Sequence, residues 1–229
     1  AGYPSLEYSK EFINSLDNST LDLLEIGIPY SDPLADGPVI AKAAFQACQN
    51  GVSTDSVFEM LKECKTNKCL VFLVYYNMIF AYGEDEFLAK CVECGISGLI
   101  VPDLPYEENK SLKTKCDKLG IALIALISVT SGYRAKKILK NTSGFVYMVS
   151  VLGVTGGEQS SQNSLQNLCA LIRKYSDLPV AVGFGLKNNA DVKAAKSYAD
   201  GAIIGTQIVK SCKDKSVSEL NAFIRELFN

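Results

Sequence analysis

Short apolar runs and amphipathic helical stretches alternate along the whole chain, and this alternation limits the possible folds more than any other feature. Most runs are apolar nearly throughout, as expected for strands covered on both faces of a parallel sheet. Seven runs are visible, at residues 21–28, 69–76, 97–103, 121–128, 145–151, 179–185 and 201–208. The sequence therefore predicts consecutive strand-helix units around a buried parallel sheet.

The segments between the runs have the spacing and the end signals of helices. We expect helices at residues 5–18, 39–50, 54–65, 83–94, 107–119, 133–141, 164–175, 189–199 and 216–228. Ser216 and Glu219 form a capping-box pattern at the start of the last helix. Gly51, Gly95 and Gly120 follow helical stretches, where a residue in the left-handed conformation commonly ends a helix.

The number of units favours a closed barrel. Residues 1–4, Ala-Gly-Tyr-Pro, look like the turn that follows a strand, so an eighth strand is expected to precede residue 1. We predict an α/β fold, a single-domain (β/α)8 TIM barrel over residues 1–229, with its first strand largely absent from this chain. An open doubly wound sheet is the alternative, but no strand-to-helix turn has the Gly-x-Gly-x-x-Gly fingerprint.

Charge and hydropathy exclude two classes of partner. The 23 Lys and Arg against 25 Asp and Glu leave a net charge of −2, which provides no basic field for nucleic-acid phosphates or anionic lipid. No apolar run approaches the ~20 residues that a membrane helix needs. We expect no nucleic-acid partner, no membrane association and a cytoplasmic location.

Cysteine and histidine usage restricts the chemistry. The chain has eight cysteines, but 229 residues with 48% apolar content do not need disulfides, so reduced thiols are expected. The Cys91-Val-Glu-Cys94 spacing suits a redox or zinc pair, yet no second pair and no histidine accompany it, and we expect no metal. Because the commonest general base is absent, carboxylates are expected to transfer protons.

Glu25 is the first candidate for that role. It lies within an apolar strand, near the end where the active site of such a barrel is found. Burial of an unpaired carboxylate raises its pKa toward the range useful for acid-base catalysis. The alternative is a structural ion pair with a neighbouring lysine.

Asp36 is the second candidate. It lies in a proline-rich loop, residues 29–38, just before Gly37. The prolines stiffen the loop, which can hold a carboxylate opposite Glu25. A turn residue or the N-cap of the following helix is an equally good interpretation of Asp36 alone.

Glycine-rich segments lie near the ends of the last three predicted strands, after the first of them at residues 153–157 and within the other two at 183–185 and 205–206. Loops after the last two strands of such barrels commonly bind phosphate, because bare glycine backbone lets N–H groups converge on an anion. Each segment alone can also be an ordinary tight turn. Residues 153–162 are further predicted to be mobile without ligand, since they offer little apolar surface.

One stretch resembles a known family. Residues 25–38 read E-I-G-I-P-Y-S-D-P-L-A-D-G-P, and V-P-D-L-P, G-V-T-G, G-F-G and the opening A-G-Y-P also occur. Together they closely resemble the tryptophan synthase alpha subunit family, end to end except for a first helix and strand that would precede residue 1. The resemblance implies a lyase that cleaves indole-3-glycerol phosphate to indole and glyceraldehyde 3-phosphate by a retro-aldol reaction in tryptophan biosynthesis.

The resemblance also assigns residues. Glu25 and Asp36 match the catalytic glutamate and aspartate of the family; Glu25 would protonate indole C3 and deprotonate the adjacent hydroxyl, and Asp36 would stabilise the charge that develops on the indole N–H. The phosphate would lie among Gly156, Gly185, Gly205 and Thr206. The indole pocket would be formed by Phe184, Tyr75, Tyr147, Ile40, Leu73 and Ile100, each of which alone is as well explained as barrel core. Two positions depart from the family pattern: Leu152 stands where a small hydroxyl residue is expected, and Thr206 stands where a serine is usual.

Partners follow from the same resemblance. It implies no cofactor in this chain and a pyridoxal-phosphate (PLP)-dependent beta subunit that condenses indole with serine, in an alpha2beta2 heterotetramer. The loop 29–38 and a loop at 77–82, which contains Met78, Ile79 and Phe80, are expected to dock this subunit. The alternative for residues 78–80 is that they fold back on an adjacent helix.

Two other functions fit a barrel of this kind. One is a catalytically inactive subunit that activates a partner, against which the presence of both Glu25 and Asp36 argues. The other is a different sugar-phosphate enzyme, such as an isomerase, which the fold alone does not exclude.

Overall fold

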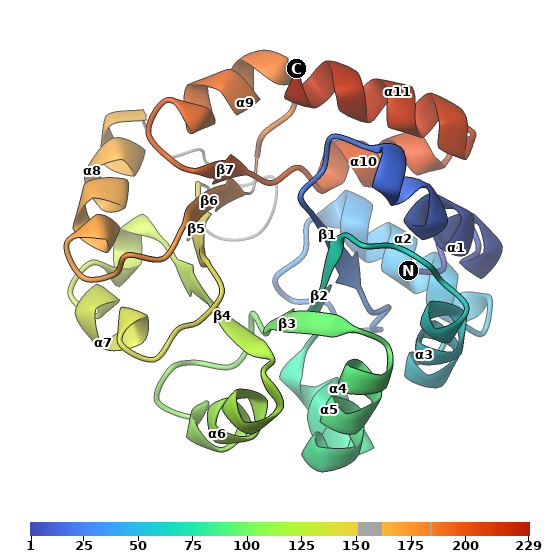
Figure 1. Ribbon diagram of the computed structural model, residues 1–229, viewed down its shortest axis with the longest axis horizontal. Coiled ribbons are helices and arrows are strands. Elements are labelled where there is room, and N and C mark those ends of the chain that lie inside the picture. Colours follow the sequence, from blue (N-terminus) through green and yellow to red (C-terminus); the bar gives the residue numbers. More distant parts are fainter. Residues whose placement is uncertain (151–161, 184) are drawn as a thin grey trace.

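The computed structural model describes residues 1–150, 162–183 and 185–229. Seven parallel strands follow one another in the order of the chain and curve into a barrel, with helices on the outside (Figure 1). The strands are β1 (Leu23–Gly27), β2 (Cys69–Leu73), β3 (Ile96–Ile100), β4 (Ala122–Ile127), β5 (Val146–Val149), β6 (Val180–Gly183) and β7 (Gly201–Ala202). The prediction of a parallel α/β barrel is confirmed.

Eleven α-helices are found among the described residues, and most of them cover the outer face of the sheet (Figure 1). They are α1 (Leu6–Ser15), α2 (Pro38–Gln49), α3 (Thr54–Lys62), α4 (Tyr76–Tyr82), α5 (Glu84–Glu93), α6 (Lys110–Leu119), α7 (Ala135–Leu139), α8 (Gln162–Arg173), α9 (Asn189–Lys196), α10 (Thr206–Cys212) and α11 (Val217–Phe228). Two 3-10 turns, Leu16–Asn18 and Val129–Ser131, complete the elements.

Alternate residues of each strand point to the two sides of the barrel wall. Glu25 is paired with Val71, and both belong to the set that points inward. The inward set includes Ile100, Ile124 and Tyr147, which pack together at the centre. The outward set, such as Phe72, packs against the helices. Burial on both sides explains why the runs are apolar throughout.

The sheet has two edges, because β1 and β7 are not paired with each other. In this opening α10 contacts α2, and the N-terminal ammonium of Ala1 donates a hydrogen bond to the carbonyl of Gly27 at 2.6 Å. An eighth strand would occupy the same position in a closed (β/α)8 barrel.

The predicted helix signals are confirmed. Ser216 and Glu219 form a capping box at α11, in which the Ser216 hydroxyl accepts from the Glu219 N–H. Gly51, Gly95 and Gly120 all have positive φ angles, between 70° and 79°. The helices α6 and α7 begin later than expected, at Lys110 and Ala135.

The prediction of a strand over residues 201–208 is wrong in its second half. Only Gly201–Ala202 is extended, and Thr206 is the first residue of α10. Short apolar runs do not distinguish strand from helix by periodicity. Here β7 is an edge strand with only β6 to pair with, so little stabilises a longer extended segment.

The prediction of a loop at 77–82 is also wrong, because these residues belong to α4. The Asp103 carboxylate accepts the N–H of Tyr76, the first residue of this helix, at 2.8 Å. Ile79 is fully buried, whereas Phe80 is 70% exposed. The stretch therefore folds back on the barrel in part and presents one aromatic ring to solvent.

The cysteines take no part in disulfides in this structure, and all eight are free. Cys91 and Cys94 are buried in the outer core, where burial raises the pKa of both thiols. Among the described residues, no group of three or more His, Cys, Asp or Glu side chains is arranged to hold a metal ion. None of the helices in this part of the chain is long and apolar enough to span a bilayer.

Candidate active site

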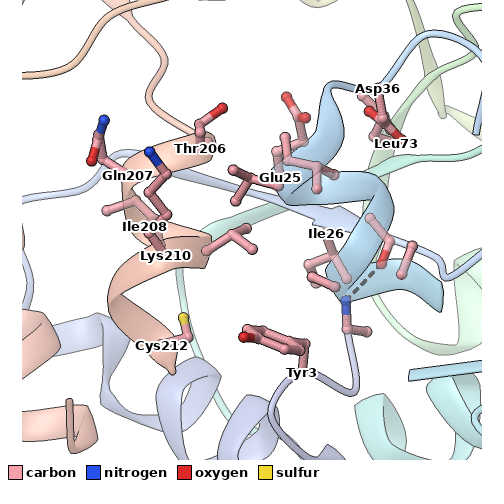
Figure 2. Close-up of a pocket in the computed structure, with 18 of the residues that line it drawn as sticks. Tyr3, Glu25, Ile26, Asp36, Leu73, Thr206, Gln207, Ile208, Lys210 and Cys212 are labelled. Carbon is pink, nitrogen blue, oxygen red and sulfur yellow. Dashed lines mark hydrogen bonds between the residues drawn. The ribbon is translucent and has the colours of Figure 1, made fainter. Parts of the chain in front are cut away.

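A cavity of about 460 Å³ lies between β1, α2 and α10; it includes the carboxyl end of β1, beside Asp36 and Thr206, and continues along β1 to Tyr8 and Phe12 of α1 and Cys212 of α10. Figure 2 shows Glu25 between the two helices, with Asp36 and Leu73 on one side of it and Thr206 on the other. Most of the predicted site residues that the structure describes line this one cavity. The carboxyl end of the strands is where barrels of this class place their active sites.

Glu25 reaches the cavity because its place in β1 points it inward. Its Oε2 atom is buried and accepts no hydrogen bond from the described residues. Burial, and next the negative charge of Asp36, raise the pKa of Glu25 from 4.5 to about 7. No lysine pairs with it in the described part of the chain, so the structural ion-pair alternative is not supported.

Asp36 lies in a turn that directs it into the same cavity. Its N–H donates to the carbonyl of Pro33 at 3.0 Å, and its carboxylate accepts the hydroxyl of Tyr75 at 3.1 Å. Burial raises the pKa of Asp36, and the bond from Tyr75 opposes this effect. The N-cap of α2 is Gly37, with no side-chain capping bond, so Asp36 is not the N-cap residue.

The predicted indole walls divide into two groups. Ile40, Leu73 and Tyr147 line the cavity. Ile100 does not line it: this side chain is fully buried in the barrel core and packs with Val71 and Ile124 beneath the site. Tyr75 does not line it either, and contacts Asp36 from behind. Phe184 lies outside the described residues.

The predicted phosphate residues meet on the opposite side. Gly185, Gly205 and Thr206 all line the cavity. Gly185 has a φ of 86°, a conformation that favours glycine, and Gly205 directly precedes α10. Gly156 falls outside the described residues, as do Leu152 and nearly all of the predicted mobile segment 153–162.

Several cavity residues were not anticipated from the sequence. Gln207 and Lys210 lie beside Thr206 on α10 (Figure 2). The interpretation of 201–208 as a strand concealed them, because in a strand Gln207 would point to the side of the sheet opposite Thr206, whereas adjacent residues of a helix are only about 100° apart. Tyr3 lies at the far end of the cavity, and no signal in the sequence pointed to it.

The arrangement is suited to acid-base chemistry on an apolar substrate with an anionic group. Glu25, with a pKa near neutrality, can give and take a proton at physiological pH. Burial and the nearby carboxylates Glu25 and Asp36 raise the pKa of Tyr147 well above its usual range, so this phenol stays protonated. Aliphatic and aromatic walls separate the carboxylates from the glycine-lined side.

Comparisons with known proteins agree with this geometry. The family model described as tryptophan synthase alpha chain matches residues 1–228. A tryptophan synthase alpha chain from Campylobacter jejuni subsp. doylei is 46% identical over 228 residues, covering 99% of this chain and 92% of that protein.

Two solved structures extend the comparison. Tryptophan synthase subunit alpha from Campylobacter jejuni superimposes with a TM-score of 0.91 at 46% identity, covering 99% of this chain and 92% of that chain. A structure of Mycobacterium tuberculosis tryptophan synthase superimposes with a TM-score of 0.91 at 32% sequence identity, covering 99% of this chain and 88% of that chain. With its fold, its carboxylate pair and these relatives in agreement, the chain belongs to the tryptophan synthase alpha chain family, the lyases that cleave indole-3-glycerol phosphate in tryptophan biosynthesis.

Proposed function

We propose that Glu25 carries out both proton transfers of indole-3-glycerol phosphate cleavage. The protonated carboxyl gives its proton to indole C3, and the resulting carboxylate then takes the proton of the side-chain hydroxyl next to that carbon. The bond from C3 to the side chain breaks, its electrons return to the indole ring, and the hydroxyl carbon becomes the aldehyde of glyceraldehyde 3-phosphate. Glu25 ends protonated, as it began.

The observation that carries this proposal is the environment of the Glu25 carboxyl. Its Oε2 is buried without a hydrogen-bond partner among the described residues, in a cavity that also contains Asp36. A pKa of about 7 leaves the acid and base forms both well populated at neutral pH. A carboxylate held in a structural ion pair would have the opposite shift.

Asp36 is assigned to the indole nitrogen. Protonation of C3 places positive charge on the ring, and the carboxylate of Asp36 stabilises that charge through the N–H. Ile40, Leu73, Tyr147 and, from the family resemblance, Phe184 enclose the ring. The phosphate is assigned to Gly185, Gly205 and Thr206, with Gly156 added by the same resemblance.

The chain has the partner of its family, a beta subunit. We assign PLP to that subunit and no cofactor to this chain, the alpha2beta2 arrangement to the assembly, and the cytoplasm to its location. The proposed docking surface consists of the loop 29–38 and α4. Leu34 is 82% exposed in the first and Phe80 is 70% exposed in the second, so both offer apolar surface at the rim.

Release of indole from indole-3-glycerol phosphate tests the proposal. Glu25→Gln keeps the size of the side chain but cannot exchange a proton, so kcat is expected to fall ~10²-fold or more with little change in KM. A wild-type chain that binds the beta subunit without cleaving substrate would support the inactive-subunit alternative. Isomerisation of a sugar phosphate without indole release would support the isomerase alternative.

A further inference from the structure

We propose that Tyr75 is a positioning residue for Asp36, whose hydroxyl holds this carboxylate in the orientation that the substrate's indole N–H requires. The inference rests on the proposed role of Asp36. It replaces the expectation that Tyr75 is a wall of the indole pocket, since Tyr75 does not line the cavity.

The hydrogen bonds of Tyr75 define the direction of its proton. Its oxygen accepts the backbone N–H of Ala35 at 3.0 Å and contacts Asp36 Oδ2 at 3.1 Å. Because the backbone N–H can only donate, the single phenolic proton is left to point at Asp36. Asp36 therefore acts as an acceptor through Oδ2, and its Oδ1 accepts no hydrogen bond from the described residues. That second oxygen is available for the substrate.

Tyr75 links the Asp36 turn to the barrel. Within the turn, the N–H of Leu34 donates to Asp32 and the N–H of Asp36 donates to Pro33. Among the described residues, every hydrogen bond between residues 32–36 and more distant parts of the chain goes to Tyr75. The position of the carboxylate therefore depends on this one hydroxyl.

Tyr75 is itself held rigidly. It is 3% exposed, and its ring packs against Tyr30 with 5.2 Å between centroids. The hydroxyl of Tyr30 accepts the side-chain amide of Asn77 at 3.1 Å. Tyr75 is also the N-cap residue of α4, whose first N–H, from Tyr76, is bound by Asp103. A side chain fixed by packing and by neighbouring hydrogen bonds is what precise positioning requires.

The hydrogen bond from Tyr75 also affects the pKa of Asp36, and this effect can be measured. Two titratable groups face the Asp36 carboxylate: Glu25, on β1, and Tyr147, on β5. Asp103, in the connection between β3 and α6, is a negative charge near the Tyr75 hydroxyl. Burial raises the pKa of Asp36 and the Tyr75 bond opposes it. Removing the hydroxyl therefore favours the protonated form of Asp36, which cannot stabilise a positive ring.

Tyr75→Phe keeps the ring and removes the hydroxyl. We expect kcat for indole release to fall about ten-fold, KM to change less than two-fold, and the acid limb of the kcat profile to move up by as much as about one pH unit. Tyr106→Phe is the matched control, because the Tyr106 hydroxyl accepts a hydrogen bond from the Asn141 side-chain amide at 3.3 Å and Tyr106 does not line the cavity. It should leave kcat and the pH profile unchanged.

Asp36→Asn separates this inference from the function on which it rests. In the Asn background, Tyr75→Phe should cause no further loss of kcat, because there is no carboxylate left to hold. If Asp36→Asn turns over like the wild type, the role of Asp36 itself is wrong. Two results would show that Tyr75 does not position Asp36. In the first, Asp36→Asn lowers kcat but Tyr75→Phe does not. In the second, Tyr75→Phe lowers kcat by the same factor in the wild-type and Asp36→Asn backgrounds. Thermal unfolding of each variant confirms that it is folded.

Discussion

Gly183 leaves room for the ring of Tyr147, since a β-carbon at position 183 would stand 2.3 Å from the Tyr147 hydroxyl oxygen. The backbone at this point cannot withdraw easily. The carbonyl of Gly183 accepts both the N–H of Ser150, at 3.0 Å, and its hydroxyl, at 2.9 Å. A glycine on β6 thus allows a buried aromatic side chain from β5 to face the carboxylates.

Gly183→Ala is therefore expected to lower the free energy of unfolding by about 1–3 kcal/mol, the usual cost of overpacking a core. Because Tyr147 must move, indole release should fall as well. Urea denaturation provides the measurement. Gly201→Ala is the control, since a β-carbon there meets its nearest neighbour, Ala181, at an ordinary 3.5 Å. Equal stability of the two variants would contradict the prediction.

The buried carboxyl of Glu25 should make the chain less stable at alkaline pH. Its pKa is about 7 in the folded chain and 4.5 as the ordinary value. Between these values the folded state keeps a proton that the unfolded state has lost, so the Glu25 contribution to stability is present below pH 4.5 and disappears as pH rises through 7. The difference is at most about 3 kcal/mol.

Glu25→Gln removes that titration. Compared with the wild type, the variant should gain relative stability as pH rises from 5 to 8, measured as the difference between their free energies of unfolding in urea. A difference that does not depend on pH would show that Glu25 has an ordinary pKa.

Gly205 offers a test of the phosphate site. Its backbone angles suit any residue, and a β-carbon there meets only Ile40, at 3.7 Å. Gly205→Asp should fold normally but raise KM for indole-3-glycerol phosphate by about ten-fold or more, because it puts a negative charge beside the phosphate. Gly205→Asn has nearly the same shape without the charge and should raise KM less. Equal KM values for the two would place the phosphate elsewhere.

Phe80 offers a test of the docking surface. Phe80→Asp should weaken binding of the beta subunit at least ten-fold, as truncation of an aromatic anchor commonly does. Cleavage of substrate by the isolated chain should not change. Val92→Asp is a suitable control, because Val92 is 49% exposed but lies near the end of α5, which leads into the opposite end of the barrel. Isothermal titration calorimetry with purified beta subunit measures the affinity of each variant, and equal affinities for Phe80→Asp and Val92→Asp would exclude α4 from the interface.

Local patterns were sufficient to predict much of the architecture and to single out the two carboxylates, Glu25 and Asp36, that line the cavity. Each of the seven apolar runs contains all or most of one of the seven strands, because burial on both faces of a parallel sheet requires segments that are apolar nearly throughout, although only Gly201 and Ala202 of the last run are extended. Glu25 could be identified because a carboxylate inside such a run is costly without a function. Asp36 and the glycines could be identified because strand ends of a barrel meet at one rim.

The depth and direction of side chains depended on the tertiary structure. Leu73 and Ile100 are register partners and both point inward, yet only Leu73 reaches the cavity. Alternation along a strand gives the side of the wall, but the tilt and stagger of neighbouring strands decide the height within the barrel. Tyr75 lies just beyond β2, where α4 begins, and the start of that helix turns it toward Asp36. Contacts of this kind join residues about forty positions apart, so they exist only once the barrel has formed.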